Sequence, residues 1–588
     1  MKIRQSLNGV WYFAPTHDQR FTNNHNVFDT DFPLYAHPLL NRRDWLRVDV
    51  PGVWQRYAPQ YELYEGVCWY YRDFELDLSP EEGDLYRLIF GGVNYRADVY
   101  LNGHFVGRHE SGYTEFVMDV SAFVQKGKNA LAVEVDNRPL LTKWPNDWGY
   151  GVFGGIHREV TLEMYRGEYL YDVALTPDYD VERGCGRLAL SARATAGLSE
   201  AILCVGEQRF LLPVENGSIL AQMEIADVSP WSADTPTLHS VTLSAEGVTY
   251  ESSRIGFRHV DYRGHLLYLN GNRETLRGVC YVYDSPKWGL VMDRGQLYED
   301  LCGIRAMGAN AIRTHYPMSR DFYELCDEMG FLTWIEPNIY CAKPPQERKE
   351  TVFSRPEFVE NALLMTKEMI DAARKYASVV IWGIGNECNV FHTEARAFFE
   401  QVAKTVRIED ATRLVGYASL YGQVGCMADL VDVMGINSYF GWYGTFREFE
   451  VCDEREPIAG GVARREVDVH ELGETIERVT GEIGDDTVLF LTEFGADSIP
   501  GYFSSASELW SENYHADLVR AYVRTAAEHA VGGTFVFAYT DYSDPSKPMN
   551  GRWNGYNLKG MVSYEREVKL PYYALKEVYE EQKKKFVQ

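Results

Sequence analysis

The stretch VVIWGIGNE, residues 379–387, is an apolar run that ends abruptly in an amide and a carboxylate. A second stretch, VLFLTEFG at residues 488–495, repeats the pattern and places Glu493 at the end of its apolar run. Short apolar runs of this kind predict strands covered on both faces, and a charge at such an end must leave the core or find a partner. Active sites of parallel α/β barrels lie at the carboxyl ends of the strands, so Glu387 and Glu493 are predicted to converge there.

The same alternation extends over the C-terminal part of the chain. Apolar runs there are separated by amphipathic helical patterns, for example at residues 321–329, 356–376 and 514–529. We expect eight strands, at residues 276–282, 309–315, 331–336, 379–387, 413–419, 433–439, 488–493 and 534–541. Eight β/α units predict a (β/α)8 TIM barrel over residues 259–588.

The chain before the barrel is predicted to be all β. Residues 1–165 alternate apolar and polar positions between turn signals such as Asn102-Gly103, which predicts a β-sandwich. Residues 166–258 form a second, shorter all-β block whose strand spacing favours an immunoglobulin-like β-sandwich. A three-domain protein agrees with the length of 588 residues, which exceeds what one hydrophobic core supports.

The bulk properties exclude several classes of partner. A net charge of −27 argues against nucleic acid and anionic membranes, which require basic surfaces. No apolar run is long enough to span a bilayer, and the ten cysteines are scattered without a CxxC pair. We therefore expect a cytoplasmic protein with reduced thiols that does not associate with membranes. No cofactor is expected, and no His or acidic cluster has convincing metal-ligand spacing, which leaves only a structural metal without an obvious motif open.

Two carboxylates facing each other in a barrel are the minimum equipment for hydrolysing a glycosidic bond. A retaining enzyme uses one as acid/base and the other as nucleophile, with the two about 5–5.5 Å apart. The nucleophile must stay ionised, so a nearby cation should lower its pKa. Arg313, at the end of the predicted strand 309–315, is the natural candidate, and His315 is expected to orient this neighbourhood. Glu336, at the end of the next strand, is a candidate partner.

Several motifs point to one enzyme family. They are LNGVW at residues 7–11, VYLNG at 99–103, GGIHR at 154–158, GFR at 256–258 and LNG at 269–271. With these motifs and the two glutamates, the chain resembles glycoside hydrolase family two, the group of β-galactosidases, β-mannosidases and β-glucuronidases. The resemblance implies that residues 1–165 form a jelly-roll, sugar-binding-like sandwich. It also implies that Glu387 is the acid/base, Glu493 the nucleophile and Asn386 a contact to the sugar 2-hydroxyl.

Within the family, three segments are similar to β-glucuronidases. They are NSYFGWY at residues 437–443, TEFGADSIPG at 492–501 and NLKG at 557–560. The last resembles the Asn-x-Lys pair with which those enzymes hold the uronate carboxylate, which implies this role for Asn557 and Lys559. An ammonium beside an amide donor makes charge-assisted bonds to a carboxylate and offers little to a neutral hydroxymethyl group. Tyr439 and Tyr443 are expected to border the nucleophile and the sugar.

The sequence departs from the family pattern around the far side of the sugar. After the first barrel strand only Asp284 remains of a His-Glu-Asp cluster, and Phe537 takes the place of a tryptophan near the end of strand eight. Asp147, in a loop of the first domain, corresponds within two residues to an acidic residue that relatives send toward the sugar hydroxyls. His470 and His515 lie on helical patterns and are expected at the surface. These departures leave the C4 epimer preference open.

The resulting hypothesis is retaining hydrolysis of terminal β-D-glucuronides. The substrate would be a glucuronide conjugate or a glucuronic-acid-containing glycan. The closest alternatives are a β-galacturonidase or a β-galactosidase on the same fold, and a further one is a non-catalytic carbohydrate-binding protein. Transfer of the sugar to another sugar in place of water is also open. The resemblance suggests a homo-oligomer.

Overall fold

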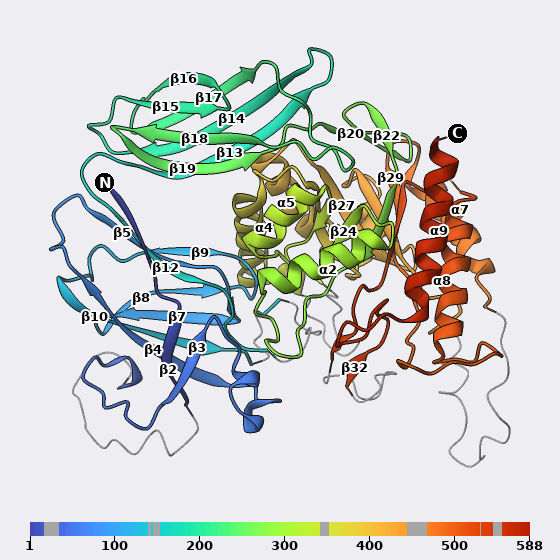
Figure 1. Cartoon of the computed structure of the whole chain (residues 1–588), viewed down its shortest axis with the longest axis horizontal. Helices are drawn as coiled ribbons and strands as arrows, with labels where there is room; N and C mark the ends of the chain where they lie inside the picture. Colours follow the sequence, from blue (N-terminus) through green and yellow to red (C-terminus); the bar gives the residue numbers. More distant parts are fainter. Residues whose placement is uncertain are drawn as a thin grey trace.

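The chain folds into two β-sandwiches followed by a closed barrel, which confirms the predicted fold class (Figure 1). The computed structural model describes residues 1–16, 34–138, 143–144, 153–340, 352–443, 467–529, 531–544 and 555–587. Predicted Asp147 lies outside the described residues.

The first sandwich packs a four-stranded sheet against a six-stranded sheet. The four-stranded sheet runs in the order β1 (Lys2–Ser6), β12 (Val160–Tyr165), β5 (Leu85–Phe90) and β9 (Phe116–Asp119). The six-stranded sheet runs in the order β3 (Leu46–Val50), β2 (Gly9–Pro15), β4 (Val67–Leu76), β10 (Gly127–Asp136), β7 (Arg96–Leu101) and β8 (His104–Glu110). The strands β6 (Val93–Asn94) and β11 (Gly155–Ile156) form a separate short pair. Apolar side chains from both large sheets, such as Leu88 and Val133, share one core.

The second sandwich lies above the first in Figure 1 and beside the barrel. One sheet contains β13 (Leu170–Asp180), β14 (Cys185–Ala194) and β17 (Ser218–Ile225). The other contains β16 (Gln208–Pro213), β15 (Glu200–Val205), β18 (His239–Ala245) and β19 (Val248–Ile255). Alternate side chains of the two sheets, including Leu190 and Leu243, form its own core. A three-stranded sheet of β20 (Val260–Arg263), β21 (Leu266–Leu269) and β22 (Asn272–Glu274) then leads into the barrel.

Buried polar side chains fasten the second sandwich to the barrel. Trp231 donates from Nε1 to the carbonyl of Asp327 at 2.9 Å. Arg258 is fully buried and donates from Nη2 to the carbonyl of Val379, at the start of a barrel strand, at 2.7 Å. Because a buried donor left without its partner costs free energy, these bonds fix where the sandwich meets the barrel.

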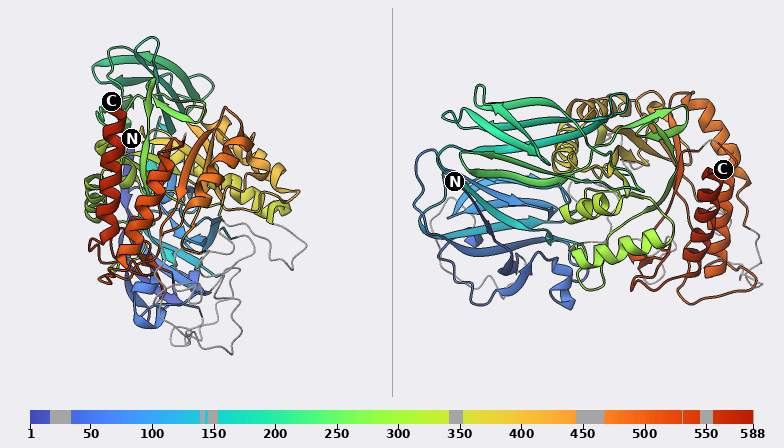
Figure 2. Two further views of the ribbon diagram at one scale, coloured as in Figure 1. Left: turned by 90° about the vertical axis from the view of Figure 1, so that its right-hand side faces the viewer. Right: turned by 45° about the horizontal axis from the view of Figure 1, so that its top comes forward.

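The barrel closes through eight parallel strands in chain order. They are β23 (Leu276–Cys280), β24 (Ala311–Arg313), β25 (Leu332–Ile335), β26 (Val379–Asn386), β27 (Leu414–Leu420), β28 (Val433–Asn437), β29 (Val488–Glu493) and β30 (Gly533–Val536). All eight predicted strands are therefore present. The helices of this part are α2 (Arg294–Ala306), α3 (Arg320–Met329), α4 (Pro356–Ala373), α5 (Ala395–Glu409), α7 (His470–Ile483), α8 (Glu512–Ala526) and α9 (Leu570–Val587). Figure 2 shows α8 and α9 packed side by side on the outside of the barrel.

Local sequence signals set the ends of these helices. The side chains of Asp293 and Ser511 accept hydrogen bonds from the first turns of α2 and α8, and Pro356 begins α4. Gly330 ends α3 in the left-handed conformation with φ 73°, which glycine adopts without a steric penalty. Every residue of β26 and β29 is buried, as the continuous apolar pattern requires.

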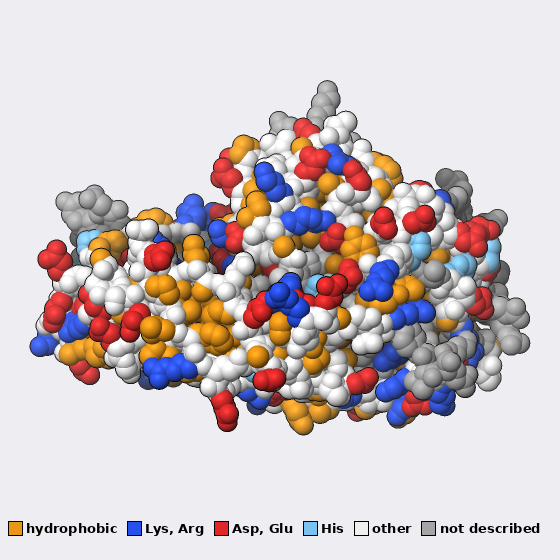
Figure 3. Space-filling model, turned by 90° about the horizontal axis from the view of Figure 1, so that it is seen from above, with side chains coloured by type: hydrophobic (Ala, Val, Ile, Leu, Met, Phe, Trp, Pro, Cys, Tyr) orange, Lys and Arg blue, Asp and Glu red, His pale blue; other side chains and the backbone are white. Residues whose placement is uncertain are grey.

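Charged side chains of both signs are mixed on the outer surface. On the face seen in Figure 3, basic side chains are scattered among acidic ones. No helix among the described residues is long and apolar enough to cross a membrane.

Candidate active site

The two predicted glutamates lie at the carboxyl ends of β26 and β29, the fourth and seventh barrel strands. Glu387 follows β26 in the left-handed conformation with φ 50°, and Glu493 is the last residue of β29. Asn437, at the end of β28 between them, donates from Nδ2 to Oε1 of Glu387 at 2.9 Å. Thr492 in turn donates to Oδ1 of Asn437 at 2.7 Å, which fixes the amide orientation. The fold thus brings both carboxylates to one end of the barrel.

Glu493 is held by three donors. Its Oε1 lies 2.8 Å from Nη1 of Arg313 and 2.8 Å from Nε2 of His315, while its Oε2 accepts from the hydroxyl of Tyr439 at 2.8 Å. Burial opposes ionisation of this carboxyl, but the hydrogen bonds and charges of His315 and Arg313 outweigh it and lower the pKa of Glu493 to about 2. Glu493 is therefore a carboxylate at neutral pH, as a nucleophile must be.

Arg313 joins several strand ends through one guanidinium. It is fully buried, and besides Glu493 it donates to Oε1 of Glu336 at 2.8 Å and to Oδ1 of Asn386 at 2.7 Å. Burial disfavours its charge, yet the carboxylates of Glu336 and Glu493 raise the pKa of Arg313 well above its usual range. The structure thus places Arg313 and His315 where the sequence put them, with Glu336 as the counter-charge behind Arg313.

The amide of Asn386 has one end occupied and the other open. Its Oδ1 accepts from Arg313 and, at 3.0 Å, from Nδ2 of Asn437. Its own Nδ2 is buried and has no hydrogen-bond partner among the described residues. A buried amide donor without a partner is uncommon, and here it is available to a hydroxyl of a bound sugar.

Lys559 lies in a cage of aromatic rings beside Glu493. Its Nζ lies 4.7 Å from the ring centre of Tyr443, 5.8 Å from that of Tyr439 and 5.7 Å from that of Trp442. The ammonium also forms an ion pair with Asp497, and both side chains are buried. The sequence predicts the lysine but not this carboxylate, which gives the ammonium a partner within the protein.

Asn557 positions the loop that carries Lys559. It donates from Nδ2 to the hydroxyl of Tyr542 at 2.7 Å and accepts from the backbone N–H of Lys559 at 3.1 Å. Asp497 accepts from the backbone N–H of Leu558 at 2.8 Å, between the two predicted residues. In this structure Asn557 therefore braces the lysine, with both ends of its amide engaged.

Asp284 and Phe537 occupy different parts of the barrel end. Asp284 is buried, and its oxygens accept from the backbone N–H of Ser543 at 2.9 Å and from the hydroxyl of Tyr564 at 3.1 Å. Burial raises the pKa of Asp284 to about 6. Phe537, just after β30, packs edge-on against His315 with ring centres 5.7 Å apart. Asp284 thus braces the loops after β30, while Phe537 forms an apolar wall beside the carboxylates.

Sequence reasoning was wrong about His515. Its helical pattern favoured the surface, but the side chain on α8 is fully buried with Nδ1 3.0 Å from the hydroxyl of Ser498. Burial, together with the charges of Lys569 and Lys559, lowers the pKa of His515 well below its usual range. This face of α8 is therefore turned toward Ser498 and the lysines, into the protein interior. In the sequence, only the apolar residues that flank His515 indicate this burial. His470, by contrast, is exposed as expected.

Other residues of the site were missed because their role appears only in three dimensions. Asn437, Asp497 and Trp442 belong to motifs quoted from the sequence, yet no spacing rule shows that they contact Glu387 and Lys559. Among the described residues, no group of His, Cys, Asp and Glu side chains is arranged to hold a metal ion.

Comparisons with known proteins agree with this geometry. Residues 260–584 match the TIM barrel domain of glycosyl hydrolases family 2, and residues 4–165 match its sugar binding domain. The β-glucuronidase of Bacteroides fragilis is 27% identical over 90% of this chain and 77% of its own length. The β-galactosidase of Priestia megaterium is 27% identical over 71% of this chain, but the match spans only 44% of that longer enzyme.

A solved structure extends the comparison to the whole chain. The GH2 β-galacturonidase from Eisenbergiella tayi, bound to galacturonate, is 26% identical and superposes with a TM-score of 0.80. The superposition covers 99% of this chain and 97% of that one. Taken with the matched barrel and sugar-binding domains, these findings show that the chain belongs to glycosyl hydrolase family 2.

Proposed function

We propose that this family 2 glycosidase removes terminal β-D-glucuronic acid from glucuronide conjugates or glucuronic-acid-containing glycans, with retention of configuration. The observation that carries the proposal is the position of Lys559. Its buried ammonium lies 5.8 Å from the ring centre of Tyr439, whose hydroxyl donates to Glu493. A cation beside the nucleophile suits a sugar whose C6 is a carboxylate, and a neutral sugar gains little from it.

The reaction follows from the two carboxylates. Glu493 is ionised and attacks the anomeric carbon, while Glu387 protonates the leaving oxygen. The glycosyl–Glu493 ester then forms and the aglycone departs. In the second step Glu387 removes a proton from water, which displaces Glu493 and releases the sugar.

The surrounding groups favour the transition state. The open Nδ2 of Asn386 donates to the sugar 2-hydroxyl, and Arg313 holds the acceptor end of the same amide. Tyr439 hydrogen-bonds the nucleophile oxygen that does not face Arg313. Donors fixed before the substrate arrives cost no reorganisation during the reaction.

A galacturonide or a neutral galactoside is the second candidate. The galacturonate-bound relative is 26% identical, with 97% of its chain covered, and galacturonate carries the same C6 carboxylate as glucuronate. The pairing of Lys559 with Asp497 favours the neutral alternative, because the ammonium does not require a substrate charge for compensation. The C4 hydroxyl distinguishes the two uronides, because glucuronate and galacturonate are epimers at that carbon.

Hydrolysis of matched chromogenic β-D-glucuronide, β-D-galacturonide and β-D-galactoside substrates tests the proposal. The wild type and Lys559→Met are compared, since methionine keeps the aromatic cage filled without the charge. We expect glucuronide turnover that falls roughly a hundredfold or more in the variant, the loss of one charge-assisted contact. Preferred galactoside turnover that is unchanged in Lys559→Met would overturn the uronide assignment and leave the retaining glycosidase intact.

A further inference from the structure

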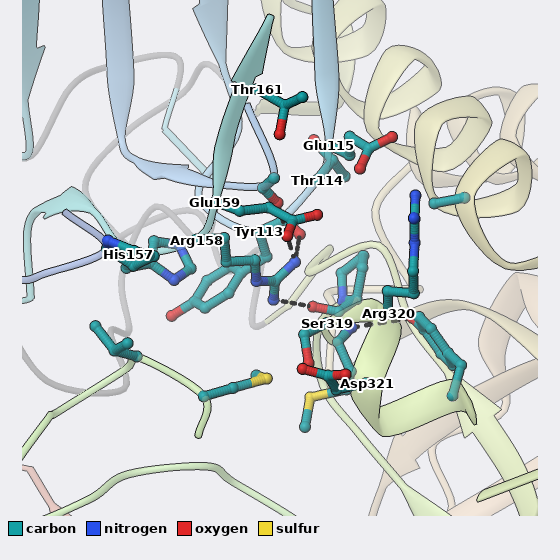
Figure 4. Close-up of a pocket in the computed structure, with 18 of the residues that line it drawn as sticks. Tyr113, Thr114, Glu115, His157, Arg158, Glu159, Thr161, Ser319, Arg320 and Asp321 are labelled. Carbon is teal, nitrogen blue, oxygen red and sulfur yellow. Dashed lines mark hydrogen bonds between the residues drawn. The ribbon is translucent and has the colours of Figure 1, made fainter. Parts of the chain in front are cut away.

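A polar cavity lies between the first sandwich and the barrel, apart from the candidate active site. It has a volume of about 570 Å³, within the range of small-molecule pockets. Its walls come from β1, the loops that precede β9 and β12, the start of α3 and one face of α4 (Figure 4). None of the residues placed in the candidate active site lines it.

The cavity contains a buried arginine without a counter-ion. Arg158 is only 8% exposed, and it donates to the backbone carbonyls of Tyr113 at 2.5 Å and Pro317 at 2.6 Å. Its Nε has no hydrogen-bond partner, and no ion pair joins its guanidinium to a carboxylate among the residues that the structure describes. Burial accordingly lowers the pKa of Arg158. A buried charge held only by neutral groups is costly, and a bound anion would offset that cost.

The N-terminus of α3 opens into the same space. Pro317, which accepts from Arg158, is two residues before Ser319, the N-cap of this helix. The Ser319 side chain makes no capping bond, and its hydroxyl has no partner in the described part of the chain. The first backbone N–H groups of a helix carry partial positive charge and attract anions. Arg158 and the α3 terminus therefore present positive charge to one region.

A second arginine borders the cavity on its open side. Arg320, the first residue of α3, makes no hydrogen bond or ion pair with any described residue. Figure 4 shows it extending toward Glu115, whose carboxylate also lacks a hydrogen-bond partner in the described chain. Burial raises the pKa of Glu115, and the more distant charge of Arg320 opposes that shift.

The remaining carboxylates around the cavity are already engaged. Glu368 accepts from Thr114 and contacts His109 at 2.9 Å, and Asp321 pairs with Arg294 at 2.6 Å. Glu159 lies 3.8 Å from Arg4, which also lines the cavity. Arg158 and Arg320 thus outnumber Glu115, the lining carboxylate that has no ion pair or hydrogen bond with a described residue. The hydroxyls of Thr114, Thr161 and Ser6 and the rings of Tyr113 and Tyr323 complete a lining suited to a hydroxylated molecule.

We propose that this cavity is a second ligand site for a small polyhydroxylated anion, such as a sugar phosphate or a sugar acid. Its anionic group lies between Arg158, Arg320 and the N-terminus of α3, and its hydroxyls face Glu115 and the threonines. The site is separate from the catalytic carboxylates and does not depend on which glycoside the enzyme hydrolyses.

Isothermal titration of the full chain with inorganic phosphate, glucose 6-phosphate and D-gluconate tests the site. Ser319→Asp supplies a good N-cap, so α3 stays folded while its new charge repels the anion. Arg320→Ala removes an exposed cation, and Arg209→Ala on the exposed side of the second sandwich is the matched control. We expect binding of a phosphate or a carboxylate probe that weakens roughly tenfold or more in both cavity variants and is unchanged in the control.

Glucose 6-phosphate and D-gluconate distinguish the two possible anionic groups. Binding of glucose 6-phosphate alone identifies a phosphate ligand, and binding of gluconate alone identifies a carboxylate ligand. A probe that occupies the catalytic centre would raise the apparent KM for a chromogenic glycoside and would bind Ser319→Asp as well as the wild type. That result, or the absence of binding by all three probes, would overturn the proposal.

Discussion

Nη1 of Arg313 lies 2.8 Å from Oε1 of Glu493, and the same guanidinium holds Glu336 and Asn386. One buried cation therefore connects the strand ends that carry the predicted nucleophile, a second carboxylate and an amide. Because Arg313 contacts all three side chains, the pKa of Glu493 depends on how these strand ends are placed.

The low pKa of Glu493 gives a prediction for pH dependence. His315→Asn removes one of the groups that hold this pKa at about 2, so the pKa should move toward its ordinary value of 4.5. The acid limb of kcat/KM should then move to higher pH, because the nucleophile becomes protonated earlier. His470→Asn, at an exposed position, is the control. An acid limb that is the same in both variants would contradict the assignment of His315.

The same shift has a consequence for stability. Because the folded pKa of Glu493 lies below its unfolded value, its ionisation stabilises the folded protein above pH 4.5 and this contribution fades as the pH falls toward 2. The difference in Tm between Glu493→Gln and the wild type should therefore be full above pH 4.5 and should nearly vanish as the pH approaches 2. A difference that is constant from neutral pH downward would contradict this linkage.

Asn386→Asp isolates the open amide donor. Aspartate keeps an oxygen for Arg313 and Asn437 but cannot donate to the sugar. We expect kcat to fall about 10²–10³-fold with little change in KM, the usual effect of removing one donor aimed at the transition state. A rise in KM of similar size with an unchanged kcat would show that the amide binds substrate without favouring the transition state.

Asp497→Asn separates the charge of Lys559 from its partner. The substitution leaves a buried ammonium unpaired, so the free energy of unfolding should fall by about 3–5 kcal/mol without ligand. A uronate would then supply the missing charge, so free glucuronate should raise the Tm of the variant more than that of the wild type. Galactose, which has no charge, is the control ligand. Equal Tm shifts with both sugars would contradict a uronate at Lys559.

The end of α3 offers a test of the fold itself. A Cβ at Gly330 would lie 2.4 Å from the carbonyl oxygen of Ala233, and its φ of 73° disfavours other residues. Gly330→Ala should therefore lower the free energy of unfolding by more than about 1 kcal/mol. Gly481→Ala, within α7 with nothing near its Cβ, should stabilise by about 0.5–1 kcal/mol. Opposite signs for the two substitutions in denaturant unfolding would confirm the local account.

The sequence was sufficient for the barrel and for the parts of the site that lie on strands. Apolar runs with a polar residue at one end locate β24, β26 and β29, and with them Arg313, Glu387 and Glu493. Strand ends have a fixed place in a closed parallel barrel, so the side chains that follow them must converge.

The parts that sequence reasoning missed are contacts between segments far apart in the chain. Asp497 meets Lys559 across 62 positions, and the burial of His515 depends on the loop that covers it. Pattern and spacing describe one element at a time, so neither the pairing of Lys559 nor the engagement of both ends of Asn557 was visible.

Trapping of the glycosyl-enzyme identifies both the nucleophile and the sugar that it accepts. The protein is incubated with a 2-deoxy-2-fluoro-β-D-glucuronyl fluoride, whose electron-poor ring slows breakdown of the ester, and the labelled peptide is identified by mass spectrometry. We expect one added fluoroglucuronyl group on Glu493 and none in Glu493→Gln. No label from this reagent, with labelling of Glu493 by the matching 2-fluorogalactosyl reagent, would contradict the uronide specificity. Labelling at another residue would contradict the mechanism.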